Sequence, residues 1–198
     1  MGRPLTAACW VAGVVLVTLG LVFHFHGSVM GEGAVAKYFA DSSPRGLGMV
    51  ALALTQPSHF VVFVLVMAVL AGWGRWRDGV LLFVVLVAVA FGNDAVLKPL
   101  VGRVKGSGLA FPSGHMVAAC LSSVALCLVL AWRWPERAFW KIGLGVGASY
   151  ALVVAWWLLS KRYHYPADVV GSVCVGVLSA GFVVWVRSRL GRGVVAKS

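Results

Sequence analysis

Two histidines and an aspartate lie at the ends of apolar stretches, where they could carry out acid–base and nucleophilic chemistry. His115 ends the segment FPSGH, and His164 precedes Asp168 by four residues in SKRYHYPAD. This spacing lets the Asp168 carboxylate accept a hydrogen bond from one ring nitrogen of His164, leaving the other free to attack a phosphoryl group. His115 could then donate a proton to the departing oxygen and later activate water. Taken alone, His164 and Asp168 fit better as an interfacial histidine and a helix-capping aspartate.

Basic side chains accompany these residues, and the ligand that suits several cations together is a phosphate group. They lie in or beside three short segments, residues 94–105, 111–115 and 160–168, which are expected on one side of a membrane. The five cations are Lys98, Arg103, Lys105, Lys161 and Arg162. Each segment alone is a modest signal, because loop lysines and arginines are most often simply solvated, but together they indicate an anion site.

The segment FPSGH has the composition of a helix start that binds anions. Pro112 suits the first turn of a helix, because its missing N–H leaves no donor unsatisfied there. The backbone N–H groups of Ser113, Gly114 and His115 would then face a ligand, and glycine lets that ligand approach the chain closely. Pro-Ser-Gly also begins many helices that catalyse nothing, so this segment alone favours the functional and the structural interpretation about equally.

The elements that must position these residues are membrane-spanning helices. Of the 198 residues, 61% are hydrophobic and only 12% are charged, which is far from the composition of a soluble globular domain. A span needs about 20 mostly apolar residues, and the sequence offers six candidates. They are residues 7–24, 57–74, 79–97, 114–132, 142–160 and 168–186. We therefore predict an all-α bundle of six transmembrane helices that forms a single domain over residues 1–198.

The basic residues indicate how this bundle is oriented. The formal net charge is +11, but the cations are scattered between apolar runs, which argues against a nucleic-acid partner. One set falls on a single side if the chain crosses six times, and the positive-inside rule makes that side cytoplasmic, together with both termini. This set comprises Arg3, Arg75, Arg77, Arg133, Arg137, Lys141, Arg187, Arg189, Arg192 and Lys197. The candidate site then faces the periplasm or the cell exterior.

The longest connection and the cysteines carry no motif of their own. Residues 25–56 are expected to lie along the membrane surface as a short amphipathic helix or to re-enter the membrane, with a plain spacer as an equal alternative. The four cysteines lie within expected spans and lack CxxC spacing, so neither a metal site nor a disulfide is predicted. They are Cys9, Cys120, Cys127 and Cys174.

The three polar segments resemble the motifs of the type 2 phosphatidic acid phosphatase (PAP2) superfamily of membrane lipid phosphatases. Those motifs are a lysine, six residues and Arg-Pro; then Pro-Ser-Gly-His; then Ser-Arg, five residues, His, three residues and Asp. The resemblance covers about residues 94–170, and it implies that Lys98 binds phosphate and His115 donates the proton. It also implies that His164 is the nucleophile, that Asp168 orients it, and that no metal or other cofactor takes part.

The sequence departs from the family pattern at two positions. Where the first motif has Arg-Pro, this chain has Lys105, so a point charge replaces a planar guanidinium, and Arg103 is the expected substitute. Where the third motif has its arginine, the chain has Leu158, and Lys161 or Arg162 is expected to supply the charge. These departures affect the phosphate-binding residues, whereas the nucleophile, its orienting carboxylate and the acid are all present.

The sequence therefore predicts a metal-independent membrane phosphatase that acts through a phosphohistidine. Its substrate is expected to be a lipid phosphomonoester or diphosphate in the bilayer: a polyprenyl phosphate or diphosphate, a polyprenyl-linked sugar phosphate, phosphatidylglycerophosphate or phosphatidic acid. Two alternatives remain open at this stage. One is a lipid phosphotransferase that uses the same residues with an alcohol as acceptor, and the other is a membrane protein that binds lipid phosphate without catalysis.

Overall fold

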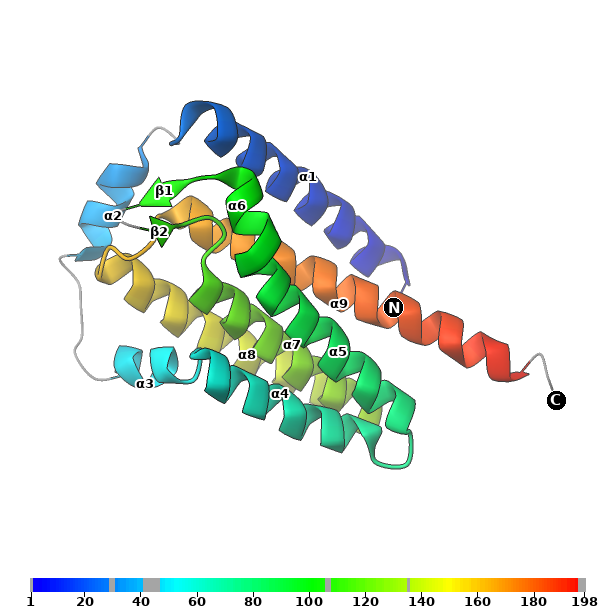
Figure 1. The fold of residues 1–198 in the computed structure, drawn as a ribbon. Helices are drawn as coiled ribbons and strands as arrows, with labels where there is room; N and C mark the ends of the chain where they lie inside the picture. Colours follow the sequence, from blue (N-terminus) through cyan, green and yellow to red (C-terminus); the bar gives the residue numbers. More distant parts are fainter. Residues whose placement is uncertain (1, 29–30, 41–46, 106–107, 135, 196–198) are drawn as a thin grey trace.

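Helices make up most of the chain and run side by side as a bundle (Figure 1). The computed structural model describes residues 2–28, 31–40, 47–105, 108–134 and 136–195. Its long helices are α1 (Gly2–His26), α4 (Pro57–Gly72), α5 (Trp76–Gly92), α7 (Gly114–Arg133), α8 (Arg137–Ser160) and α9 (Pro166–Val195). Its short elements are α2 (Glu32–Ala40), α3 (Leu47–Ala53), the π-helix η1 (Asn93–Leu97), α6 (Lys98–Val101) and the antiparallel strands β1 (Val104–Lys105) and β2 (Gly108–Leu109). The predicted helical fold is confirmed, with this small hairpin as an addition.

Five helical segments among the described residues are long and apolar enough to cross a membrane. They are Pro4–His26, Trp76–Val101, Gly114–Arg133, Ala138–Ser160 and Pro166–Leu190. The sixth expected span, 57–74, corresponds to α4, which is apolar but has 16 residues, fewer than the about 20 of a typical span. Five spans are thus supported by helix length and composition, and the sixth stays a prediction.

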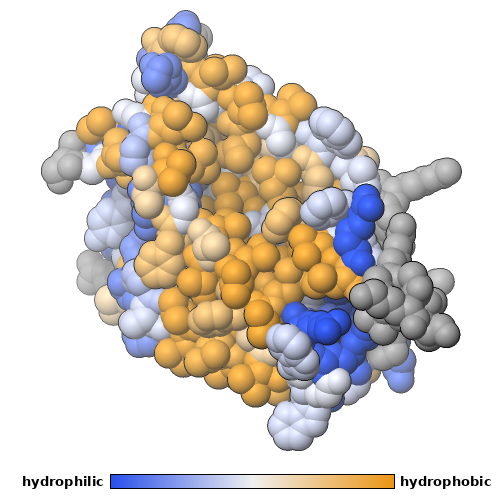
Figure 2. All heavy atoms as spheres, turned by 45° about the vertical axis from the view of Figure 1, so that its right-hand side comes forward, coloured by the Kyte–Doolittle hydropathy of each residue, from blue (hydrophilic) through white to orange (hydrophobic). Residues whose placement is uncertain are grey.

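The outer faces of the long helices are apolar, as expected for contact with lipid chains. Figure 2 shows a broad hydrophobic surface with hydrophilic side chains on two sides of it. Val69 on α4, Val84 on α5 and Leu152 on α8 each expose more than half of their area. On a soluble monomer so large an apolar surface would be exceptional, whereas a surrounding bilayer covers it.

Helix α7 lies against α4, α5, α8 and α9, and small residues set its distance from α8. A Cβ added at Gly147 would lie 2.8 Å from the Cβ of Ser123, and one at Gly143 would lie 3.0 Å from the Cα of Cys127. The Ser123 hydroxyl also donates a hydrogen bond to the Gly147 carbonyl oxygen at 2.8 Å. Membrane helices associate through such close small-residue contacts, and here they fix the helix whose first turn carries His115.

The two ends of the bundle carry different elements. The start of α1, the end of α9 and the connection from α4 to α5 share one end, and α2, α3, α6 and the β1–β2 hairpin share the other (Figure 1). At the first end Arg187 on α9 pairs with the buried Asp78 on α5 at 2.9 Å. The Arg133 guanidinium there donates to the Trp73 carbonyl oxygen at 2.9 Å.

The connection over residues 25–56 contains the two short helices α2 and α3. The placement of this connection along or within the membrane stays a prediction, and residues 29–30 and 41–46 lie outside the described part of the chain. Both helices pack against α8, and α2 also packs against α9. The connection thus covers the end of the bundle at which the two histidines lie.

Candidate active site

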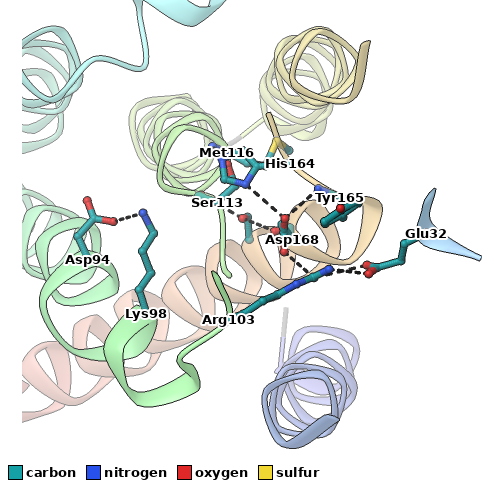
Figure 3. Close-up of polar contacts among 10 residues, drawn as sticks. Glu32, Asp94, Lys98, Arg103, Ser113, Met116, His164, Tyr165 and Asp168 are labelled. Atoms are coloured by element: carbon teal, nitrogen blue, oxygen red, sulfur yellow. Dashed lines mark hydrogen bonds and ion pairs between the residues drawn. The ribbon is translucent and has the colours of Figure 1, made fainter. Parts of the chain in front are cut away.

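His164 and Asp168 meet where the chain passes from α8 into α9. The Nδ1 atom of His164 lies 3.3 Å from Oδ2 of Asp168, and the same oxygen accepts the Tyr165 backbone N–H at 2.8 Å (Figure 3). Asp168 is fully buried. Because an ionised carboxylate can only accept hydrogen bonds, this geometry makes Nδ1 of His164 the donor and leaves Nε2 as the free nitrogen.

The second oxygen of Asp168 is bound by Arg103, which the chain turns inward. Gly102 ends α6 with a φ of 70°, a left-handed conformation that glycine adopts without strain. The next residue, Arg103, places Nη1 2.7 Å from Oδ1 of Asp168 and Nη2 beside a carboxylate oxygen of Glu32 (Figure 3). Its guanidinium also lies 3.8 Å from the ring centre of Phe23. Arg103 is 2% exposed, so it holds two buried carboxylates rather than facing an open cavity.

Thr55, in the turn between α3 and α4, holds the other histidine. Its hydroxyl donates to the Leu52 carbonyl oxygen at 2.7 Å and lies 3.0 Å from Nδ1 of His115. A hydroxyl has one proton to donate, so the Thr55 oxygen is the acceptor from His115 Nδ1–H. His115 therefore resembles His164 in this respect, because its Nδ1 is bonded and its Nε2 is free.

The first turn of α7 is tied to the first turn of α9. Ser113 is the N-cap of α7, where its hydroxyl oxygen accepts the Met116 N–H at 3.3 Å. The Ser113 backbone N–H donates to the Asp168 carbonyl oxygen at 3.4 Å. The Ser172 hydroxyl lies within hydrogen-bonding distance of both the Ser113 and the Asp168 carbonyl oxygens, at 3.1 and 2.7 Å. Ser113 thus positions the two motifs relative to each other, while its side chain is buried.

A cavity of about 420 Å³ opens between the two histidines and Lys98. His115, His164, Lys98 and Gly114 all line it. Lys98 Nζ lies 2.6 Å from Oδ1 of Asp94, and a Cβ added at Gly114 would lie 3.2 Å from that Nζ. The ammonium therefore sits against the start of α7, whose first N–H groups have no partner within the helix. Free N–H groups and a lysine at one helix start form a site that suits an anion.

The other cations predicted to bind phosphate lie away from this cavity. Arg103 is buried against carboxylates, as described above, and Lys161 is exposed at the end of α8. Lys105 and Arg162 line a separate cavity. Burial lowers the pKa of the Lys105 ammonium, opposed by the attraction of Asp168. Four of the five cations thus do not line the cavity of the two histidines, and Lys98 is the one that does.

Two residues that contact the site carry no signal in the sequence, namely Glu32 and Thr55. Both come from the connection over residues 25–56, in which no motif is recognisable. Their roles depend on how α2 and α3 fold back onto the bundle, which local patterns do not encode. By contrast, the spacing of Asp94 and Lys98 already allows their pairing within one helical turn. Among the described residues, no group of three or more His, Cys, Asp and Glu side chains could hold a metal ion.

Comparisons with known proteins give the family and the fold. The model of the PAP2 superfamily matches residues 93–192, which contain all the motif residues. The fold is similar to the crystal structure of the first transmembrane PAP2 type phosphatidylglycerolphosphate phosphatase from Bacillus subtilis, with a TM-score of 0.76 and 20% sequence identity. The similarity covers 91% of this chain and 96% of that chain. A search of curated proteins found no match.

Proposed function

The chain belongs to the PAP2 superfamily, and from this premise we propose that it is a membrane lipid phosphatase that works through a phosphohistidine without a metal ion. The proposal is based on the arrangement of the two histidines. Each has its Nδ1 engaged, by Asp168 or by Thr55, and both rings line one cavity with Lys98. A nucleophile and an acid need this arrangement, in which two free Nε2 atoms share one space.

In the first step the terminal phosphate of the lipid occupies the cavity. Lys98 exchanges its carboxylate partner Asp94 for a phosphate oxygen, and the N–H groups at the start of α7 bind the remaining charge. The Nε2 lone pair of His164 attacks phosphorus, and the bond from phosphorus to the lipid oxygen breaks. That oxygen takes the proton from Nε2 of a protonated His115, so a lipid alcohol, or a lipid phosphate in the case of a diphosphate, leaves.

In the second step water releases the phosphate. His115 has become neutral, and because its hydrogen bond to the Thr55 oxygen keeps the remaining proton on Nδ1, the lone pair lies on Nε2. This atom takes a proton from water as the water oxygen attacks phosphorus and the bond from phosphorus to His164 breaks. Asp168 holds Nδ1–H of His164 throughout and stabilises the positive ring of the intermediate, as the carboxylate of a catalytic triad does. Both histidines return to their starting states.

The phosphate-binding residues we propose are Lys98 and the backbone of Gly114 and His115. Arg103 is proposed to position Asp168 instead, and Ser113 to cap α7. The orientation follows the positive-inside rule, because Arg75, Arg133 and Arg187 lie at the end of the bundle away from the histidines. The site then faces the periplasm or the cell exterior.

The test is phosphate release by the purified protein in excess chelator. The substrates are a polyprenyl phosphate and diphosphate, a polyprenyl-linked sugar phosphate, phosphatidylglycerophosphate and phosphatidic acid. We expect wild type to release phosphate and the variants His164→Ala and His115→Ala to lose this activity. His59→Ala is the matched control, because His59 is exposed and its ring bonds the Ala53 carbonyl oxygen outside the cavity. An inactive wild type, or an active His164→Ala, would overturn the proposal.

Two other functions would use the same residues. In a phosphotransferase an alcohol replaces water in the second step, so a phosphorylated acceptor would appear when glycerol or a lipid alcohol is added. A binding protein without catalysis would retain affinity for lipid phosphate and release none. The similar fold belongs to a phosphatidylglycerolphosphate phosphatase, and this places phosphatidylglycerophosphate first among the substrates to be tested.

A further inference from the structure

A second cavity, of about 500 Å³, lies next to the segment that carries His164. It is lined by Lys105 from β1, by Arg162 and Tyr165 from the connection between α8 and α9, and by Gly33 and Lys37 from α2. His164 lines the first cavity and not this one. The connection between α8 and α9 therefore contributes residues to both cavities.

The second cavity carries positive charge, and no acidic side chain among its lining residues neutralises it. Three of its five lining residues are cations, and none of the five is acidic. Among the described residues, the carboxylates that act on Lys105 are those of Asp168 and Glu32, and both are bound by Arg103. Excess positive charge at a concave surface attracts an anion, and phosphate is the anion most often bound by such clusters.

Lys105 is the least satisfied of these cations. Its Nζ is buried and has no hydrogen-bond partner among the described residues. It lies 3.6 Å from the ring centre of Tyr165, which is a cation–π contact. A buried ammonium without a hydrogen-bond acceptor is costly, and an anion in the cavity would supply the missing acceptor.

The backbone conformation of Arg162 is a second observation that indicates a binding site. Its φ is 54°, in the left-handed region that residues other than glycine, asparagine and aspartate rarely adopt. Residues held in such conformations cluster at binding sites. Here the conformation belongs to the connection that brings Arg162 and Tyr165 to one cavity and His164 to the other.

We propose that the second cavity binds the phosphate group of an anionic membrane phospholipid, separately from the site at which His164 reacts. The volume is typical of a pocket for a small organic ligand, and so it accommodates a headgroup as well as its phosphate. The cavity lies at one end of the apolar bundle, and Tyr38 and Val104, which adjoin Lys37 and Lys105 in the sequence, are exposed. This is the depth at which phospholipid headgroups meet a membrane protein.

The proposal concerns binding, so it does not depend on the proposed phosphatase activity. The background protein is the full chain that carries both His164→Ala and Lys98→Met. These two substitutions weaken phosphate binding at the first cavity. Binding of short-chain phosphatidylglycerol and of inorganic phosphate is measured by calorimetry. We expect the background protein to bind the phospholipid, and the added pair Lys37→Gln and Arg162→Asn to weaken this binding about tenfold or more, because charge-assisted hydrogen bonds are lost.

The choice of variants separates a specific site from general attraction and from misfolding. Lys37 and Arg162 are exposed, and asparagine tolerates the left-handed conformation of position 162. The matched control is Arg77→Gln with Lys141→Gln, which removes the same charge from two other exposed positions and is expected to leave binding unchanged. Lys105→Met is a further variant that removes the buried ammonium and is expected to weaken binding as well.

The inorganic phosphate arm identifies what the cavity recognises. Binding of phospholipid but not of inorganic phosphate supports recognition of the whole headgroup, and competition between the two supports recognition of the phosphate alone. The proposal is overturned if the background protein binds no phospholipid, or if the Lys37 and Arg162 substitutions change binding no more than the control pair does.

Discussion

Replacement of Thr55 by valine tests whether the tautomer of His115 matters. The two side chains have nearly the same shape, and Thr55 is 3% exposed, so the substitution removes a hydroxyl with little change in packing. The His115 Nδ1–H, now 3.0 Å from the hydroxyl oxygen, then has no acceptor. The Leu52 carbonyl oxygen loses its donor from Thr55 as well.

The size of the effect follows from this one hydrogen bond. Leaving a buried donor without its acceptor costs about 1–3 kcal/mol. A change of about 1–2 kcal/mol in the free-energy difference between the two tautomers of His115 changes their ratio by a factor of about 5 to 30. The neutral ring of His115 would then carry its proton on Nε2 in a larger fraction of molecules, and that form cannot take a proton from water. We expect kcat to fall by about 5- to 30-fold, with little change in KM, because Thr55 is not one of the groups that we propose to bind the phosphate.

The assay is steady-state phosphate release from a lipid phosphate in mixed micelles, for wild type, Thr55→Val and Thr55→Ser. Serine keeps the hydroxyl, so it should restore most of kcat. A valine variant that matches wild type would refute the role assigned to the hydroxyl. A serine variant as slow as the valine variant would instead indicate that the methyl group, and hence packing, is what matters.

Three further predictions follow from neighbouring contacts. Arg103→Lys should lower the free energy of unfolding by about 1.5–3 kcal/mol, because one ammonium cannot bond both carboxylates as the guanidinium does; an unchanged denaturation midpoint would contradict this. Lys98→Met should lower kcat/KM by about 100-fold, as expected for loss of a cation beside the transferring phosphoryl group, and kinetics like those of wild type would remove Lys98 from the site. Burial lowers the pKa of Lys105 from 10.5, so phospholipid affinity at the second cavity should fall as pH rises through that lowered pKa, before exposed lysines lose their charge. Lys105→Arg should abolish this decline, because arginine stays protonated, and an identical pH profile in both proteins would show that Lys105 does not control it.

The sequence predicted best what depends on local spacing. The four-residue separation of His164 and Asp168 corresponds to a pair in the structure, and Lys98 lies with both histidines on one cavity. The apolar runs predicted the long helices, because hydrocarbon thickness sets the length of a span, although α1 begins five residues earlier and α9 ends nine residues later than the expected spans. The predicted sixth span stays untested, because α4, with its 16 residues, is shorter than a typical span.

What the sequence did not predict depends on contacts between distant segments. Arg103 was expected at the phosphate because it lies two residues before the expected arginine position, but the left-handed turn at Gly102 directs it toward Asp168 and Glu32. Thr55 is 60 residues away from His115 in sequence, so no local pattern could have paired them. Glu32 and Thr55, which no motif predicts, thus reach the site because α2 and α3 pack against the bundle.

We expect the hydrogen bonds between Ser113, Asp168 and Ser172 to limit where the protein opens. They join the starts of α7 and α9, each of which also positions one of the two histidines, so sliding of one helix against the other would break them. Thr55 belongs to neither α7 nor α9. It contacts His115 through one side-chain hydrogen bond from the turn before α4. A hinge motion that admits a lipid is therefore expected at that turn. Such a motion would release His115 while the distance between the two helices stays constant, and closure would restore the contact between Thr55 and His115.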